Sequence, residues 1–209
     1  MKGSGDLLTG VILAGGKDDN INGTLKSFLP LNKKRVLDYQ IKEMKKLCKE
    51  IVIVTNTPPL FLSSVSSDIR IITDFHKDKG VLGGMFSALS LSTHPYLWIV
   101  GSGMPFISSK AAKYMSSMLE NSEYHAILPY VKGETYPLHG IYSKGLLPTF
   151  EDLKWSSDYN DAFHFIEQTS YLGISEQMFL KNRISPSFIY SIKNEDDYRL
   201  AIAMKENRS

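Results

Sequence analysis

The chain has 209 residues, of which 43% are hydrophobic and 22% charged, and its formal net charge at pH 7 is +2. These values fit one globular domain over residues 1–209, and so small a charge gives no reason to expect nucleic acid or an anionic membrane as the main partner. No apolar run approaches the roughly 20 residues of a transmembrane helix, and the first residues lack the apolar core of a signal peptide. The single cysteine, Cys48, cannot form an internal disulfide. We therefore expect a cytoplasmic protein.

Hydrophobic periodicity predicts strands that alternate with helices along the whole chain. Strands are predicted over 8–14, 51–54, 69–72, 96–100, 125–128 and 138–142. Helices are predicted over 36–46, after Pro59, over 82–89, 108–118, 146–153 and 161–168, and from Asn194 to Met204. Ser108 and Asn194 are residues that cap helix N-termini well. The alternation predicts a three-layer α/β fold with a mostly parallel central sheet.

The first predicted strand ends in Gly15 and Gly16, and Lys26 follows ten residues later, just before a second apolar run. A buried strand that ends in glycine brings a backbone without side chains to the edge of the sheet, where its N–H groups can approach an anion. The nearby lysine could neutralise that anion. This arrangement indicates a phosphate site, although a strand followed by two glycines also occurs in ordinary tight turns.

Two more loops follow predicted strands, over residues 74–80 and 101–106, and both contain glycine. In parallel α/β sheets, ligands bind beyond the carboxyl ends of the strands, where the topology reverses. We therefore expect functional residues in these loops and in the glycine loop at 15–25.

Taken together, the loop motifs resemble the MobA-like nucleotidyltransferases, in particular the molybdenum cofactor guanylyltransferases. The motifs are Leu13-Ala14-Gly15-Gly16, Lys26 ahead of Leu29-Pro30-Leu31, Asp74, Gly80-Val81-Leu82-Gly83-Gly84 and Met104-Pro105-Phe106. Residues 136–142 and the tail at 191–200 also resemble segments of that family. The likeness runs in the same order along nearly the whole chain. It implies a Rossmann-like nucleotidyltransferase fold.

The resemblance also implies a reaction. The family transfers the guanylyl group of GTP to the phosphate of molybdopterin, releases pyrophosphate and uses Mg²⁺. The nucleotide-binding residues implied here are Leu13, Ala14, Gly15, Gly16, Lys26 and Asp74.

Several positions depart from the family pattern. Gly103 stands where the family has the Mg²⁺-binding aspartate before Met-Pro-Phe, and Asn20 stands where it has an arginine. Leu25 replaces the aspartate that precedes the lysine. The two tail asparagines that the family links to the pterin site are Ser191 and Lys193 in this chain.

Two interpretations follow from these departures. In the first, the chain is a guanylyltransferase with a rebuilt metal site that recruits Mg²⁺ through Asp18, Asp19, Asp74 or Asp78. In the second, it is a catalytically silent homologue that binds a nucleotide or a protein partner. The loss of both the metal carboxylate and the arginine predicts that Mg²⁺-dependent catalysis is impaired. A nucleotidyltransferase of other specificity, such as a sugar-nucleotide pyrophosphorylase, is a further alternative. The histidines show no metal-ligand spacing, and His139 is expected to lie on the strand that faces the acceptor.

Overall fold

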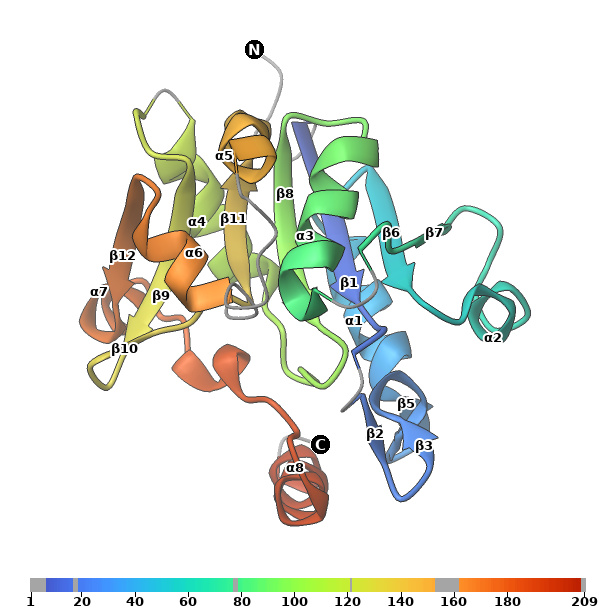
Figure 1. The fold of residues 1–209 in the computed structure, drawn as a ribbon. Helices are drawn as coiled ribbons and strands as arrows, with labels where there is room; N and C mark the ends of the chain where they lie inside the picture. Colours follow the sequence, from blue (N-terminus) through green and yellow to red (C-terminus); the bar gives the residue numbers. More distant parts are fainter. Residues whose placement is uncertain (1–6, 17–18, 77–78, 121, 153–161, 208–209) are drawn as a thin grey trace.

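The computed structural model describes residues 7–16, 19–76, 79–120, 122–152 and 162–207. Within these ranges eight strands form one central sheet, with helices on both of its faces (Figure 1). Seven strands follow the order β10-β9-β11-β8-β1-β6-β7, and β12 pairs with β9. The strands are β1 (Leu8–Leu13), β6 (Glu50–Thr55), β7 (Arg70–Thr73), β8 (Tyr96–Gly101), β9 (Ala126–Val131), β10 (Glu134–Thr135), β11 (Gly140–Ser143) and β12 (Tyr171–Ser175).

Most of the sheet is parallel, as the sequence predicts. β1 pairs in parallel with β6 and β8, β6 with β7, and β12 with β9. β11 is antiparallel to both β8 and β9, and β10 is antiparallel to β9. The chain between β9 and β11 is too short for a parallel crossover, which needs a dozen residues or more, so β11 returns antiparallel. The predicted α/β class is confirmed.

Two apolar layers form the core, one on each face of the sheet. α3, α5 and α6 cover one face, where Met85, Phe150 and Phe165 are buried. α1, α4 and α7 cover the other, where Met115 is buried beside Trp98. The helices are α1 (Val36–Met44), α2 (Pro58–Leu62), α3 (Gly80–Leu91), α4 (Ser109–Leu119), α5 (Leu147–Asp152), α6 (Ala162–Glu167), α7 (Glu176–Lys181) and α8 (Glu195–Glu206).

The two predicted helix caps are present. The Ser108 hydroxyl accepts a hydrogen bond from the backbone N–H of Ala111 at 3.2 Å and begins α4. The Asn194 side chain accepts from the N–H of Asp197 at 2.9 Å and begins α8. Within the described ranges, no helix is both long enough and apolar enough to cross a membrane.

The strand order reverses at β1. From β1 the chain passes through α1 to β6 and β7 on one side, then through α3 to β8 on the other side. The carboxyl ends of β1 and β8 therefore flank the crevice in which such sheets bind ligands.

Two small hairpins and α8 lie beyond this edge of the sheet (Figure 1). The hairpins are β2 (Asn20–Ile21) with β3 (Thr24–Leu25) and β4 (Pro30–Leu31) with β5 (Lys34–Arg35), and short 3-10 helices lie at η2 (Lys26–Phe28), η3 (Lys144–Leu146) and η4 (Pro186–Ile189). A third apolar cluster joins them, with Ile21, Leu31, Phe106, Ile192 and Ala201 buried together. The C-terminal helix is therefore packed onto the segment that follows the glycine loop. The sequence did not predict the hairpins, β12 or α7.

Candidate functional site

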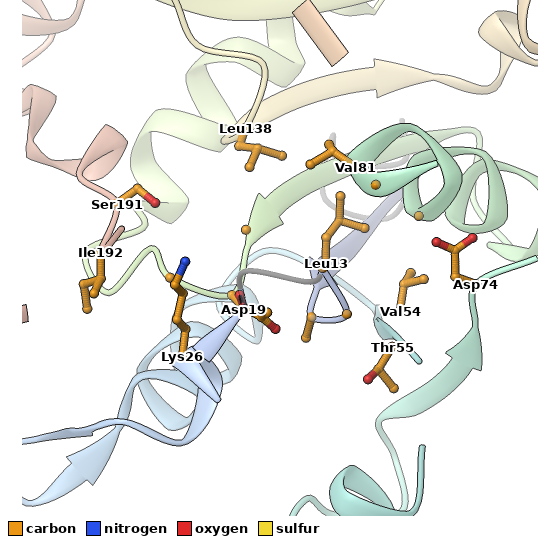
Figure 2. Close-up of a pocket in the computed structure, with 18 residues that line it drawn as sticks. Leu13, Asp19, Lys26, Val54, Thr55, Asp74, Val81, Leu138, Ser191 and Ile192 are labelled. Carbon is orange, nitrogen blue, oxygen red and sulfur yellow. Dashed lines mark hydrogen bonds between the residues drawn. The ribbon is translucent and has the colours of Figure 1, made fainter. Parts of the chain in front are cut away.

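A cavity of about 480 Å³ opens beyond the carboxyl ends of β1 and β8 (Figure 2). Its walls come from the three strand-end loops and from the C-terminal segment around Ser191. All six residues implied by the resemblance line it: Leu13, Ala14, Gly15, Gly16, Lys26 and Asp74. Among the described residues that line the cavity, the charged ones are Asp19, Lys26 and Asp74. The three strand-end loops thus meet at one cavity.

Two hydrogen bonds hold the start of the glycine loop against the end of β6. The N–H of Ala14 donates to the carbonyl of Val54 at 2.8 Å, and the Asn56 side chain donates to the carbonyl of Gly15 at 2.8 Å. A Cβ atom on Gly15 would lie 2.9 Å from the backbone nitrogen of Asn56. Only glycine lets the loop lie this close to the end of β6, and this placement leaves the loop backbone open to the cavity.

Asp74 holds the loop between β7 and α3. Its Oδ1 accepts from the N–H of His76 at 2.8 Å and from the hydroxyl of Ser87 at 3.1 Å. A Cβ atom on Gly83 would lie 2.9 Å from Asp74 Oδ2 and 2.4 Å from the carbonyl oxygen of His76. The carboxylate therefore fixes the loop against the first turn of α3, which also borders the cavity through Gly80 and Val81.

Gly103 is buried under the C-terminal segment. The N–H of Ile192 donates to its carbonyl at 2.8 Å, and a Cβ atom on Gly103 would lie 2.8 Å from the carbonyl oxygen of Ile192. The same Cβ would lie 3.2 Å from Cδ of Lys26. The tail and the lysine stem thus fill the space that a carboxylate at position 103 would need.

Asp19 brings a carboxylate to this wall from the glycine loop. Ser102 donates its hydroxyl hydrogen bond to Oδ1, while Oδ2 is buried without a hydrogen-bond partner. The residue is 6% exposed. Burial raises the pKa of Asp19 from 3.8 to about 6, against the lowering effects of the Ser102 hydrogen bond and of the Lys26 charge.

The other positions singled out from the sequence, Asp18, Asp78 and Asn20, add no described side chain to the cavity wall. Asp18 and Asp78 lie outside the described residues. Asn20 is exposed on β2 and is not among the residues that line the cavity. The charge that the family pattern places at positions 20 and 103 is therefore absent from this wall.

His139 lies in the core and lines neither cavity described in this section. It is fully buried, and its Nε2 accepts a hydrogen bond from the N–H of Ser108 at 2.9 Å. Its ring packs against Trp98 and Phe188, with centroids 5.0 and 4.5 Å away. Burial lowers its pKa to about 3, so the ring is neutral at physiological pH. His139 was expected on the strand that faces the acceptor, but β11 begins at Gly140, and His139 lies in the turn before it, with a φ of 66° and its ring in the core.

A second cavity, of about 740 Å³, adjoins the first and shares Val81, Leu138 and Ser191 with it. Aromatic, thioether and charged side chains line it, and the charges are of both signs: Met104, Lys132, Tyr136, Glu176, Tyr190, Lys193, Asp197 and Met204. The motif at 136–142 and the tail at 191–200 both contribute, as their resemblance to family segments suggests. Sequence reasoning missed Tyr190, whose only signal is its position directly before the tail motif.

The sequence is similar to that of a known protein family and of several named relatives. The model of the MobA-like NTP transferase domain matches residues 10–170. The chain belongs to this family. A MobA-like relative from Natranaerobius thermophilus, named as a probable molybdenum cofactor guanylyltransferase, is 32% identical over 66% of this chain and 68% of its own length. The molybdenum cofactor guanylyltransferase of Syntrophotalea carbinolica is 29% identical over 80% of this chain and 77% of its own.

The MobA-like fold is also present in a solved structure. The crystal structure of molybdopterin-guanine dinucleotide biosynthesis protein A from Archaeoglobus fulgidus matches with a TM-score of 0.81. The match covers 95% of this chain and 99% of the other at 18% identity, so it concerns the fold.

Proposed function

We propose that the protein is a nucleotidyltransferase that moves the guanylyl group of GTP onto the phosphate of molybdopterin and releases pyrophosphate. The observation that carries the proposal is the pair of adjoining cavities. The glycine loop and Lys26 form a wall of one cavity, and the other is lined by Tyr136 and Tyr190 together with aliphatic and charged side chains. Transfer between two substrates needs two such sites that share a wall. The names of the curated relatives supply the choice of GTP and molybdopterin.

The proposed reaction is an in-line displacement at the α-phosphorus of the nucleotide. An oxygen of the acceptor phosphate forms the new P–O bond, the bond between the α-phosphorus and the bridging oxygen breaks, and pyrophosphate leaves with the electron pair. Because little covalent chemistry falls to the protein, its main task is to position both substrates and to neutralise charge. Lys26 supplies a positive charge at the first cavity, and the glycine loop allows the phosphates to approach the backbone.

The Mg²⁺ that the family uses would have to be held here by Asp19 together with the phosphates of the nucleotide. In the described part of the chain, no group of three or more histidine, cysteine or acidic residues is placed to hold a metal without help. Mg²⁺ is commonly held by one or two carboxylates together with substrate phosphates, and the buried, unpartnered Oδ2 of Asp19 suits that role. When bound, the ion would neutralise phosphate charge.

A second candidate function is a catalytically silent homologue that binds a nucleotide or a protein partner. Gly103 favours it, because position 103 has neither a ligand side chain nor space for one. Under this candidate, Mg²⁺-dependent transfer is impaired while the nucleotide cavity remains.

Thermal-shift titrations with GTP, ATP, CTP and UTP, each with and without Mg²⁺, test whether the first cavity binds a nucleotide. A ligand that binds only the folded state, at a hundredfold excess over its Kd, raises stability by about 2.7 kcal/mol. We expect a clear shift with GTP. A shift with another nucleotide alone indicates a transferase of other specificity, and no shift with any nucleotide contradicts the proposal.

A further inference from the structure

We propose that Asp19 is the residue through which this chain holds the divalent cation of a bound nucleoside triphosphate, from the glycine loop rather than from the end of β8. The inference rests on the proposed nucleotide site and assigns a cation ligand within it. Three features of the wall around Asp19 lead to it.

The first feature is the unpartnered oxygen. Asp19 is 6% exposed, it lines the first cavity, and its Oδ2 has no hydrogen-bond partner. A buried carboxylate oxygen without a partner is unfavourable unless a cation or a donor compensates it. A ligand of positive charge entering the cavity would complete its surroundings.

The second feature is the tether that holds the side chain. The Ser102 hydroxyl donates to Oδ1, and the N–H of Ser102 donates to the carbonyl of Leu13 at 2.9 Å. Ser102 is the immediate neighbour of Gly103. The tether therefore fixes the Asp19 carboxylate at the end of β8, while leaving its second oxygen uncommitted.

The third feature is that position 103 is closed. A side chain there would meet the Ile192 carbonyl and the stem of Lys26. Lys26 lies in the same wall as Asp19 and attracts it electrostatically. A carboxylate beside a triphosphate is repulsive unless a cation lies between them, so Asp19 favours binding of the nucleotide together with its metal.

The test measures GTP affinity by calorimetry in the absence of an acceptor, with and without Mg²⁺. It compares the wild type with Asp19→Asn and with Asp68→Asn, which changes an exposed carboxylate paired with Lys45 away from the cavity. Asparagine keeps an oxygen that can accept from Ser102, so Asp19→Asn is expected to fold.

We expect Mg²⁺ to tighten GTP binding to the wild type and to Asp68→Asn. In Asp19→Asn this tightening falls about tenfold or more, while affinity without Mg²⁺ is unchanged or higher because a negative charge has gone. Protein-bound Mn²⁺ followed by electron paramagnetic resonance in the presence of GTP gives a second readout, and among the three proteins its signal is weakened only in Asp19→Asn.

An Asp19→Asn protein that keeps the full Mg²⁺ effect overturns the inference. If Asp19→Asn weakens GTP binding equally with and without Mg²⁺, the inference is also overturned, because Asp19 then has a structural role only. If the wild type binds GTP but Mg²⁺ changes nothing, the nucleotide site stands and the cation role of Asp19 falls. If the wild type binds no nucleotide under either condition, the proposed function itself is refuted, and this inference with it.

Discussion

Replacing Asp19 with asparagine is expected to make the ligand-free protein more stable at neutral pH. The Asp19 carboxylate is buried, its Oδ2 has no partner, and its pKa is raised from 3.8 to about 6. At pH 8 it is ionised in both the folded and the unfolded state, yet it is better solvated in the unfolded state. The charge therefore disfavours folding.

The size of the effect follows from the shift in pKa. A rise of roughly two pKa units corresponds to about 3 kcal/mol at a pH above both values. The new amide N–H is expected to be buried without an acceptor, which offsets about 1 kcal/mol. The net gain is then about 2 kcal/mol, or about 4–8 °C in Tm for a chain of this length.

The stability gain of Asp19→Asn should depend on pH if the buried charge of Asp19 is its cause. A carboxyl whose pKa is raised by folding contributes stability below its unfolded pKa, and this contribution is lost as the pH rises through the folded value near 6. The advantage of Asp19→Asn over the wild type should therefore be larger at pH 8 than at pH 5, by roughly 1–2 kcal/mol. Urea unfolding of both proteins at the two pH values measures this difference, with Asp68→Asn as the control. If the difference in unfolding free energy between Asp19→Asn and the wild type does not change with pH, the buried charge of Asp19 does not destabilise the fold. The same holds if the variant is less stable than the wild type at pH 8.

Three further predictions concern other parts of the molecule. Gly103→Asp should lower the free energy of unfolding in urea by about 1–3 kcal/mol, because the new Cβ would meet the Ile192 carbonyl. It should also expose the C-terminal tail to proteases. An unchanged urea midpoint contradicts this prediction. As the pH falls from about 6.5 toward 3, His139 should destabilise the fold by up to about 1.4 kcal/mol per pH unit, because only the unfolded state takes up its proton. His139→Gln should flatten that slope, and an unaltered slope places the titration elsewhere. Lys26→Met should weaken GTP binding about 10–100-fold in calorimetry, and unchanged affinity removes Lys26 from the site.

The central layout of the fold was predictable because its signals are local. Apolar runs such as Ile51–Val54 identify buried strands, and Ser108 and Asn194 identify helix starts. The strand-end loops were expected to carry function because parallel α/β sheets bind ligands beyond the carboxyl ends of their strands. The six implied site residues all line the cavity at these strand ends.

The hairpins escaped prediction because strands of two residues show no periodicity. One signal was present: Asn22 and Gly23 both have positive φ values, 50° and 79°, and Asn-Gly is the dipeptide that favours a tight hairpin turn. β12 (Tyr171–Ser175) was missed because its run is short and contains Gly173.

The most informative features of the site depend on contacts between distant residues. The sequence shows that position 103 lacks a carboxylate, but only the structure shows that Ile192 and Lys26 fill its place. Likewise, Asp19 and Ser102 are 83 positions apart, and their hydrogen bond has no sequence signature. The burial of His139 likewise depends on distant residues, because its ring packs against those of Trp98 and Phe188.

The proposed function requires this chain to transfer a nucleotidyl group. The most direct measurement incubates the protein with Mg²⁺, molybdopterin and GTP labelled at the α-phosphate. We expect the label to move to the pterin and pyrophosphate to appear in equal amount, only when both substrates are present. GTP binding without any transfer of label would contradict the proposed function and would favour the catalytically silent homologue.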